Sequence, residues 1–361
     1  MNPFCNLILK ENNLQNPLVV ADVGAAGGID QPWLQYADIA NILCFGFEAF
    51  PPNFDVLKSH NKVKYFPYAI SNNVGKAEFW GNATNGFLYV GEDKENEVNE
   101  NISYEKLIVD TETLDNLCNK EVLPSIDVLK IDAEFHEVAV LEGAERQLEK
   151  NTLFVKAEFS FSRDLGNSIY RIVDILRAKG FTLFDLSCGY YTFNALGGGD
   201  ALFLKNIFYV LSLPEEKEHI KIMVLKLISI CLIVNNINYA FFCLKESSKK
   251  GLFTSSEYNS LYDTITEICF APVALMKSGK TKIKLKLCKL LFLLCHMFGG
   301  EMRNESTPKG NRLFKSDRLF FKSKFLQKKN SQYLEKLYEV AMEHNERYNI
   351  FEESLKSVDQ G

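Results

Sequence analysis

Three side chains suited to proton transfer follow one apolar segment of the chain. Residues 126–132 read Ile-Asp-Val-Leu-Lys-Ile-Asp, and Glu134 and His136 come directly after them. Carboxylates and imidazole act as general bases, and histidine titrates closest to neutral pH. We therefore expect His136, Asp132 and Glu134 to form a catalytic group, with His136 as the base. The alternatives are that His136 begins a helix facing solvent and that Asp132 caps that helix.

A turn of small residues follows a second apolar segment, residues 18–23. A turn without bulky side chains at the end of a central strand lets the backbone approach a ligand closely. Glu48 ends the next predicted strand, where an acidic side chain can accept hydrogen bonds from both ribose hydroxyls of an adenosine. The two features favour either a nicotinamide cofactor or S-adenosylmethionine, and a tight turn without a ligand is the alternative. The turn residues expected to contact the cofactor are Asp22, Gly24, Ala25 and Gly28.

Short apolar runs alternate with amphipathic stretches over the first part of the chain, which predicts a doubly wound α/β sheet. Residues 81–109 are acidic and rich in Asn, and we expect an excursion that covers a site or forms a plain surface loop. The predicted strands are residues 18–23, 43–48, 63–70, 126–132, 153–159, 182–186 and 201–204, with a turn at 197–199. The predicted helices are residues 52–60, 138–148 and 169–179.

The charge changes sign near residue 205. Residues 1–204 carry 16 basic and 29 acidic side chains, a net charge of -13, whereas residues 205–361 carry 25 and 17, a net charge of +8. Helical spacing replaces strand patterns from residue 206 onward, including a predicted core helix within residues 220–244. We expect one domain over residues 1–205 and an all-helical accessory domain over residues 206–361.

A basic segment, Lys277 to Lys329, carries 15 basic and 3 acidic residues. It predicts contact with an anionic surface, either a membrane or a glycan, with a solvated helix face as the alternative. We expect no nucleic acid partner, because no recognised nucleic-acid module accompanies the basic residues. No signal peptide and no apolar run of about 18 residues are found, which predicts a cytoplasmic protein that can lie against a membrane.

The motifs together resemble those of the FkbM-type methyltransferase family over roughly residues 18–205. The match begins with Asp22-Val23-Gly24-Ala25-x-x-Gly28, Phe47-Glu48-x-x-Pro51 and Thr113-Leu114-Asp115. Its most specific part runs from Asp127 to Ala144, with Lys-Ile-Asp-x-Glu-x-His-Glu followed by Leu-x-Gly-Ala, and Glu158 and Asp200-Ala201-Leu202-Phe203 also match.

This resemblance implies a class I methyltransferase fold, which is a Rossmann-like sheet of seven mostly parallel strands. It also implies S-adenosylmethionine as the methyl donor and, usually, an oxygen acceptor on a sugar, polysaccharide or polyketide-like metabolite. Ile70 and Ser71 would then lie beside the adenine, and Asp132 would hold the acceptor or the amino group of the cofactor. Ligation of a divalent metal by the carboxylates is a further alternative, but the spacing does not require a metal, and we expect none.

The sequence departs from the family at Ala26, Ala49 and Phe135, where the family has Asn, Pro and Gly. If the glycine at position 135 serves a positive φ or a close approach, Phe135 strains or blocks the site. The leading prediction is an O-methyltransferase acting on a small-molecule or glycan hydroxyl. Two alternatives are a catalytically inactive binding protein that keeps the methyltransferase fold and an NAD(P)-dependent oxidoreductase.

Overall fold

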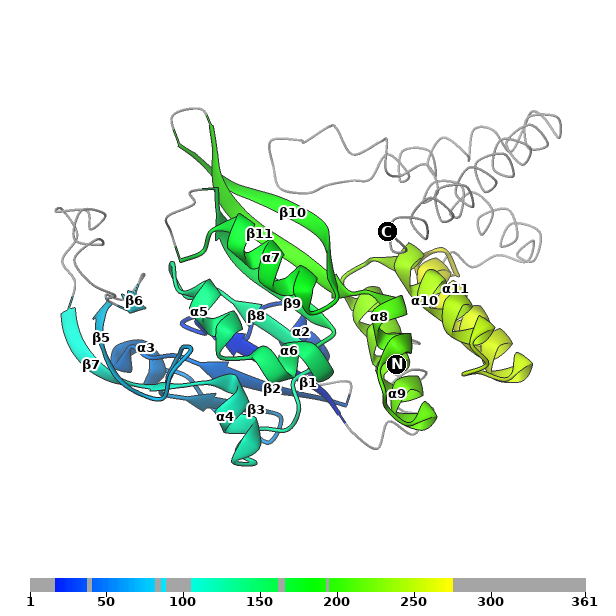
Figure 1. Cartoon of the computed structure of the whole chain (residues 1–361), viewed down its shortest axis with the longest axis horizontal. Helices are drawn as coiled ribbons and strands as arrows, with labels where there is room; N and C mark the ends of the chain where they lie inside the picture. Colours follow the sequence, from blue (N-terminus) through cyan, green and yellow to red (C-terminus); the bar gives the residue numbers. More distant parts are fainter. Residues whose placement is uncertain are drawn as a thin grey trace. The chain divides into compact units, whose positions relative to one another are not determined.

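The computed structural model describes residues 17–37, 41–81, 86–88, 105–161, 166–192 and 195–274 (Figure 1). The strands are β1 (Leu18–Val23), β2 (Ile42–Phe47), β3 (Val63–Phe66), β4 (Ala69–Ile70), β5 (Gly75–Gly81), β6 (Gly86–Leu88), β7 (Glu105–Glu112), β8 (Val128–Ile131), β9 (Phe154–Ser160), β10 (Phe181–Thr192) and β11 (Ala195–Lys205). The helices are α2 (Trp33–Ala37), α3 (Pro51–Phe54), α4 (Leu114–Asn119), α5 (Glu137–Glu142), α6 (Glu145–Lys150), α7 (Ile169–Ala178), α8 (Ile207–Ser212), α9 (Lys217–Ile233), α10 (Ile237–Lys249) and α11 (Ser255–Ala274).

Seven strands form the main sheet in the order β10-β11-β9-β8-β1-β2-β3. The five strands from β9 to β3 are parallel to one another, whereas β11 runs antiparallel to both of its neighbours, β9 and β10. Strand β10 therefore runs in the same direction as the five parallel strands, and β11 is the one reversed strand of this sheet. Helices α5, α6 and α7 lie in front of this sheet in Figure 1. This arrangement confirms the predicted class I methyltransferase fold, with its mostly parallel, seven-stranded sheet.

The strand order reverses beside β1, because the chain moves outward through β2 and β3 and returns to β8 on the other side. Val23 of β1 lies beside Phe47 of β2 and Ile131 of β8 in the register. The residues that follow these three strands therefore meet at one edge of the sheet. In open α/β sheets, ligands bind at the carboxyl ends of the strands where the order reverses.

A second, smaller sheet has the order β4-β7-β5-β6 and includes both described ends of the predicted excursion. The prediction of one strand over residues 63–70 is wrong, because the chain divides there into β3 of the large sheet and β4 of the small one. Pro67 lies between them and cannot donate a hydrogen bond to a sheet, so the ladder ends before it. The small sheet buries its own apolar cluster, consisting of Phe50, Ala69, Phe79, Leu88 and Val109.

Three further predictions of local structure need correction. The helix expected over residues 52–60 is limited to α3, and the one over 138–148 is two helices, α5 and α6, that meet at Gly143 and Ala144. The turn expected at residues 197–199 is instead part of β11, where Gly198 pairs with Ser160 and Gly199 with Phe159. Glycine occurs in strands as well as in turns, so three consecutive glycines do not by themselves distinguish a turn from a strand.

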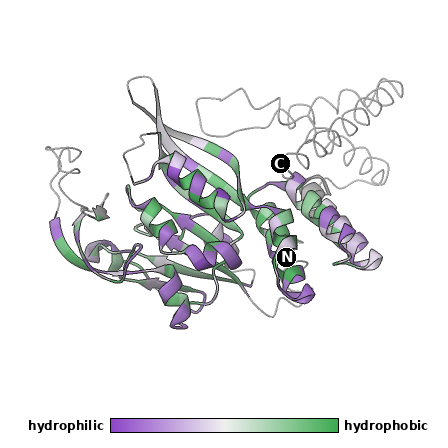
Figure 2. Ribbon diagram, viewed as in Figure 1, coloured by the Kyte–Doolittle hydropathy of each residue, from purple (hydrophilic) through white to green (hydrophobic). Residues whose placement is uncertain are grey.

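Helices alone follow β11 in the described part of the chain. The core helix predicted within residues 220–244 is two helices, α9 and α10, separated at Asn235, which has a φ of +59°. Figure 2 shows α9 as mostly hydrophobic, in keeping with its twelve buried residues between Ile220 and Ile233. Among the helices that the structure describes, none combines the length and apolarity needed to cross a membrane.

A buried ion pair fastens α9 to the amino-terminal edge of the large sheet. Lys226 Nζ lies 2.7 Å from Asp127 Oδ2, and the same oxygen accepts a hydrogen bond from the Val19 amide at 2.8 Å. The chain divides into two compact units, Met1–Ile265 and Thr266–Gly361, so α8, α9 and α10 belong to the first. The domain boundary near residue 205 stays a prediction, and the basic segment 277–329 lies outside the described residues.

Candidate active site

The turn after β1 has a shape that requires glycine. Gly24 has a φ of +78°, and a Cβ there would lie 1.8 Å from the carbonyl oxygen of Asp132. The Gly24 and Ala25 amides both donate to the Phe47 carbonyl at 3.0 Å, and Gly28, with a φ of +94°, closes the turn onto the Ala25 carbonyl. The glycines therefore let the turn press against the backbone that follows β8.

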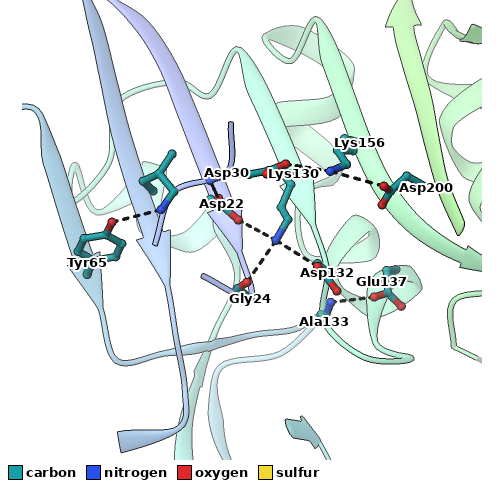
Figure 3. Close-up of polar contacts among 11 residues, drawn as sticks. Asp22, Gly24, Asp30, Tyr65, Lys130, Asp132, Ala133, Glu137, Lys156 and Asp200 are labelled. Carbon is teal, nitrogen blue, oxygen red and sulfur yellow. Dashed lines mark hydrogen bonds and ion pairs between the residues drawn. The ribbon is translucent and has the colours of Figure 1, made fainter. Parts of the chain in front are cut away.

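Asp22 lies beside this turn near the end of β1, and Figure 3 shows its carboxylate directed toward the Lys130 ammonium. Its side chain is fully buried, Oδ2 accepts a hydrogen bond from the Asp30 amide at 2.7 Å, and Oδ1 lies 3.1 Å from Lys130 Nζ. Burial raises the pKa of the Asp22 carboxyl to about 6, although Lys130 and the Asp30 amide act in the opposite direction. Asp22 does not line the cavity described below, so its position favours shaping the turn over direct contact with a cofactor.

Glu48 lies at the end of β2 with one carboxylate oxygen held in place. Oε1 accepts a hydrogen bond from the Phe50 amide at 2.7 Å, and Pro51 begins α3 directly afterward. Burial raises the pKa of this carboxyl, while the Phe50 amide and the Lys130 ammonium lower it. A carboxylate fixed by the backbone at the edge of a cavity is suited to accept hydrogen bonds from a ribose.

The loop after β8 has an unusual backbone. Glu134 and Phe135 have φ values of +46° and +70°, the left-handed region that favours glycine. The loop is also crowded, because a Cβ on Gly166 would lie 1.7 Å from the Phe135 carbonyl oxygen. Position 135 therefore has the positive φ that the sequence analysis raised as a condition for strain, and this chain has a bulky residue there.

His136 follows this loop at the start of α5, where its side chain is buried rather than facing solvent. Its Nε2 lies 2.9 Å from Ser71 Oγ, a hydrogen bond between two residues that the sequence singled out separately. Gly143, at the end of α5, makes this packing possible, because a Cβ there would lie 2.0 Å from the Ser71 carbonyl oxygen. The glycine of the Leu-x-Gly-Ala motif thus lets α5 pack against Ser71, the residue that hydrogen-bonds the His136 imidazole.

One cavity of about 150 Å³ lies among these elements. All three predicted catalytic residues, Asp132, Glu134 and His136, line it, as do the predicted cofactor residues Gly24, Glu48 and Ile70. Asp22, Ala25, Gly28 and Ser71 are not among its lining residues. Further lining residues, which the sequence did not predict as catalytic or cofactor-binding, are Val23, Ala26, Phe47, Ala49, Phe50, Asn53, Ala69, Phe79, Leu88 and Ala133.

The missed lining residues include an apolar wall. Phe50, Phe79 and Leu88 belong to the buried cluster of the small sheet, and the rings of Phe50 and Phe79 stack with centroids 6.2 Å apart. Phe79 precedes the excursion and Leu88 lies in it, so the described start of this segment contributes to the wall of the cavity. Apolar residues in short strands indicate only a core, so the sequence carried no signal for this role.

Several carboxyl groups lie close to one another around the loop that follows β8. Burial raises the pKa of Glu134, and burial also raises that of Glu137 to about 7. Glu158 of β9, which pairs with Asp200 of β11, has a pKa raised to about 8 by burial and by the surrounding carboxylates. Within the described residues, no group of three or more His, Cys, Asp or Glu side chains is arranged to hold a metal ion.

The Thr113-Leu114-Asp115 motif has a structural role. Thr113 Oγ1 accepts from the Asn116 amide at 3.0 Å and caps α4. Asp115 accepts from the Arg146 and Gln147 amides at 2.8 and 3.0 Å, and so caps α6, whose own preceding residue is an alanine. These bonds fix the helices behind the site, and neither residue lines the cavity.

The comparison with protein families agrees with this geometry. The profile of the family described as "Methyltransferase FkbM domain" matches residues 22–183. Residues 22–183 are therefore similar to an FkbM methyltransferase domain, as the motifs predicted, and that family uses S-adenosylmethionine. None of the curated proteins matches the chain.

Several solved structures that are similar to this chain are methyltransferases, and their sequence identity to it is low. A methyltransferase FkbM from Methylobacillus flagellatus is 13% identical with a TM-score of 0.32, and the match covers 56% of this chain and 48% of that one. A magnesium protoporphyrin IX methyltransferase from Synechocystis with bound S-adenosylmethionine is 11% identical with a TM-score of 0.30, covering 54% and 73%. A precorrin-6y C5,15-methyltransferase from Geobacter metallireducens is 14% identical with a TM-score of 0.29, covering 53% and 82%. This chain thus spans about half the length of the first of these proteins.

Proposed function

We propose that this protein transfers a methyl group from S-adenosylmethionine to a hydroxyl oxygen of a sugar or a glycan precursor. The observation that carries the proposal is that Glu48, at the end of β2, and the Asp132–Glu134–His136 group, after β8, line the same cavity. A ribose-binding carboxylate and a proton-accepting group are thereby brought to opposite sides of the turn at Gly24.

The residues present fit this cofactor. The close approach at Gly24 leaves the cavity edge free of a side chain, and Glu48 offers a fixed carboxylate for the ribose. The lining contains three carboxylates, Glu48, Asp132 and Glu134, and no lysine or arginine. An acidic lining suits a cofactor that carries a positive sulfonium, whereas a nicotinamide cofactor brings an anionic pyrophosphate. The lining therefore supports S-adenosylmethionine over the oxidoreductase alternative.

The donor supplies a methyl group on a positively charged sulfur, which leaves as a neutral thioether. The bond from the acceptor oxygen to the methyl carbon forms as the carbon–sulfur bond breaks, and the hydroxyl proton must go to a base. His136 is the base in this proposal, and its hydrogen bond to Ser71 Oγ fixes the ring orientation. Asp132 and Glu134 can accept hydrogen bonds from other hydroxyls of a sugar acceptor.

Phe135 does not argue against activity in this geometry. It lies between Glu134 and His136, but it is not among the residues that line the cavity. Its cost is conformational, and the side chains on both sides of it still reach the site. The catalytically inactive alternative therefore becomes an outcome of the test below.

Calorimetry with S-adenosylhomocysteine and with NAD tests the donor. We expect binding of the first alone, weakened at least about tenfold by Glu48→Ala because a fixed ribose partner is lost. Glu121→Ala, at an exposed glutamate away from the site, is the matched control and should bind as the wild type does. Binding of NAD alone, or equal binding by Glu48→Ala and the wild type, would contradict the proposal.

Methyl transfer from radiolabelled S-adenosylmethionine to a panel of monosaccharides, oligosaccharides and sugar nucleotides tests the acceptor. We expect labelled methyl ethers with at least one sugar and a rate at least about a hundredfold lower for His136→Gln, since a general base contributes this much. Labelling of amines or carbon acceptors alone would refute the oxygen assignment. Donor binding without any transfer would favour the non-enzymatic alternative.

A further inference from the structure

Lys130 is the one charged side chain in the middle of β8, and no part of the proposed chemistry uses it. The residue is 6% exposed, and its ammonium contacts three groups at the carboxyl edge of the sheet (Figure 3). Nζ lies 3.1 Å from Asp22 Oδ1, 3.2 Å from the Gly24 carbonyl oxygen and 3.5 Å from Asp132 Oδ2. Burial acts to lower its pKa, but Asp22 and Asp132 outweigh burial, and the pKa rises.

These three contacts belong to different parts of the site. In the proposed function, Gly24 lies on the cofactor side of the cavity and Asp132 on the acceptor side. Asp22 does not line the cavity, and it accepts a hydrogen bond from the Asp30 amide. Lys130 does not line the cavity itself, so its direct contacts reach a ligand through the groups that it holds. The Lys130 ammonium thus contacts one group on each side of the cavity, the Gly24 carbonyl oxygen and the Asp132 carboxylate.

The neighbouring lysine does not duplicate this function. Lys156 lies beside Lys130 in the register, but its ammonium pairs with Asp30 at 2.8 Å and with Asp200 at 3.6 Å. Neither of those carboxylates lines the cavity. Lys156 is also 25% exposed at its side chain, where water screens an ion pair and reduces its strength. Lys156 therefore serves as a matched control for Lys130.

We propose that Lys130 is a positioning residue that sets the distance between the cofactor-binding turn and Asp132 by holding the Gly24 carbonyl and the Asp132 carboxylate. The proposal rests on the proposed function, because it assumes that this turn binds S-adenosylmethionine. It gives a physical reason for the lysine in the Lys-Ile-Asp motif. A neutral side chain of similar length would fill the space but leave Asp22 as a buried carboxylate without its cation.

The pH dependence of S-adenosylhomocysteine binding separates this role from simple packing. In the wild type, Asp22 gains a proton as the pH falls through about 6, which weakens its pair with Lys130. Affinity should therefore fall as the solution becomes acidic. In Lys130→Met, the ionised Asp22 has no cation, so its pKa rises further and the turn is best formed when Asp22 is protonated. Affinity should then fall as the pH rises, which is the opposite trend.

The double variant Asp22→Asn/Lys130→Met isolates the pair from other titrating groups. With Asp22 neutral at every pH, the loss of affinity toward high pH seen in Lys130→Met should disappear. Other charged or polar groups near the pair are the same in both variants, so their effects cancel in the comparison. These groups are Asp30, Cys44, Glu48, Tyr65, Asp132, Glu134, His136, Glu137, Lys156 and Glu158.

The experiment is calorimetry with S-adenosylhomocysteine between about pH 5 and about pH 8, with thermal unfolding of each variant as the folding control. We expect Lys130→Met to bind at least about tenfold more weakly than the wild type near pH 8, and Lys156→Met to keep the wild-type trend. Lys130→Arg, which keeps the charge, should recover part of the affinity. If Lys130→Met does not fold, weaker binding by the double variant than by Asp22→Asn alone supports the same conclusion.

Wild-type affinity and pH trend in Lys130→Met would overturn the proposal, as would equal trends in Lys130→Met and the double variant. Equal binding by Asp22→Asn and the double variant would overturn it as well. A wild-type protein that does not bind S-adenosylhomocysteine would refute the cofactor assignment instead. The failure of this inference and the failure of the proposed function are therefore distinguishable.

Discussion

Replacement of Phe135 by glycine and by alanine tests the most unusual backbone feature of the site. At a φ of +70°, a side chain of any size places Cβ too close to the following carbonyl oxygen, and only glycine escapes this contact. Both replacements remove the same phenyl ring and any contacts that it makes. The difference between Phe135→Gly and Phe135→Ala is therefore independent of the ring and reports the effect of a Cβ on the folded and the unfolded chain.

The two contributions to this difference have opposite signs. A left-handed conformation costs an L-residue about 1–2 kcal/mol, which favours glycine. Glycine loses more freedom on folding, which favours alanine by about 0.4–1 kcal/mol at positions where both residues fit. The net expectation is that Phe135→Gly is more stable than Phe135→Ala by about 1 kcal/mol. At an ordinary position the order of the two variants is reversed.

Urea unfolding gives the free energy of unfolding of each variant from its midpoint and slope. Glu121 has a φ of +57° and lies outside the site, so Glu121→Gly and Glu121→Ala form a matched pair of variants. The glycine variant should be the more stable of the two there as well. Tyr170, an exposed residue of helix α7, is the opposite control, where alanine should be more stable by about 1 kcal/mol. An alanine variant at position 135 that equals or exceeds the glycine variant would refute the assignment of strain to this loop.

Three other changes have definite expected outcomes. Gly24→Ala should weaken S-adenosylhomocysteine binding more than about tenfold, because its Cβ would lie 1.8 Å from the Asp132 carbonyl oxygen, whereas Gly27→Ala, with nothing within 4 Å, should bind normally. Asp115→Ala should lower the free energy of unfolding by about 1 kcal/mol through the lost cap of α6 and leave binding unchanged. Glu137 is buried with Oε2 unpartnered, and its folded pKa of about 7 lies above the unfolded value of 4.5, so its stabilising protonated state is lost as the pH rises through about 7. Glu137→Gln should therefore be more stable than the wild type by up to about 3 kcal/mol at pH 8 in chemical unfolding, with little difference at pH 4; equal stability at both would contradict the shift.

The sequence predicted the parts of the site that depend on local geometry. Gly24 and Glu48 follow buried strands, and a strand end followed by a turn can be recognised without knowing the neighbouring strands. Phe79 and Leu88 could not be predicted in this way, since apolar residues in short strands resemble an ordinary core. Asp22 was predicted to contact the cofactor, whereas its position favours shaping the turn. Sequence alone could not distinguish these roles, because the buried Asp22 carboxylate pairs with Lys130, more than one hundred positions away in the chain.

Lys130 itself carried a signal that the motif comparison alone does not explain. A lysine among Val128, Leu129 and Ile131 has to place its ammonium in a buried layer, where an unpaired charge is strongly unfavourable. Such a residue predicts carboxylates on the adjacent strands at the same depth, which Asp22 provides on β1. The presence of the pair could thus be inferred from strand composition, although the identity of the partner required the register.

The two sides of the cavity are built in different ways, and this explains why the donor is easier to infer than the acceptor. The donor side depends on backbone positions, with Gly24 in close contact and Glu48 held by an amide, so few residue types are permitted. The acceptor side depends on exchangeable side chains such as Asp132 and Glu134. They belong to a loop that keeps its left-handed conformation although position 135 is phenylalanine and not glycine. Side chains such as Asp132 and Glu134 can change without loss of the fold, so the acceptor has to be identified by the transfer assay.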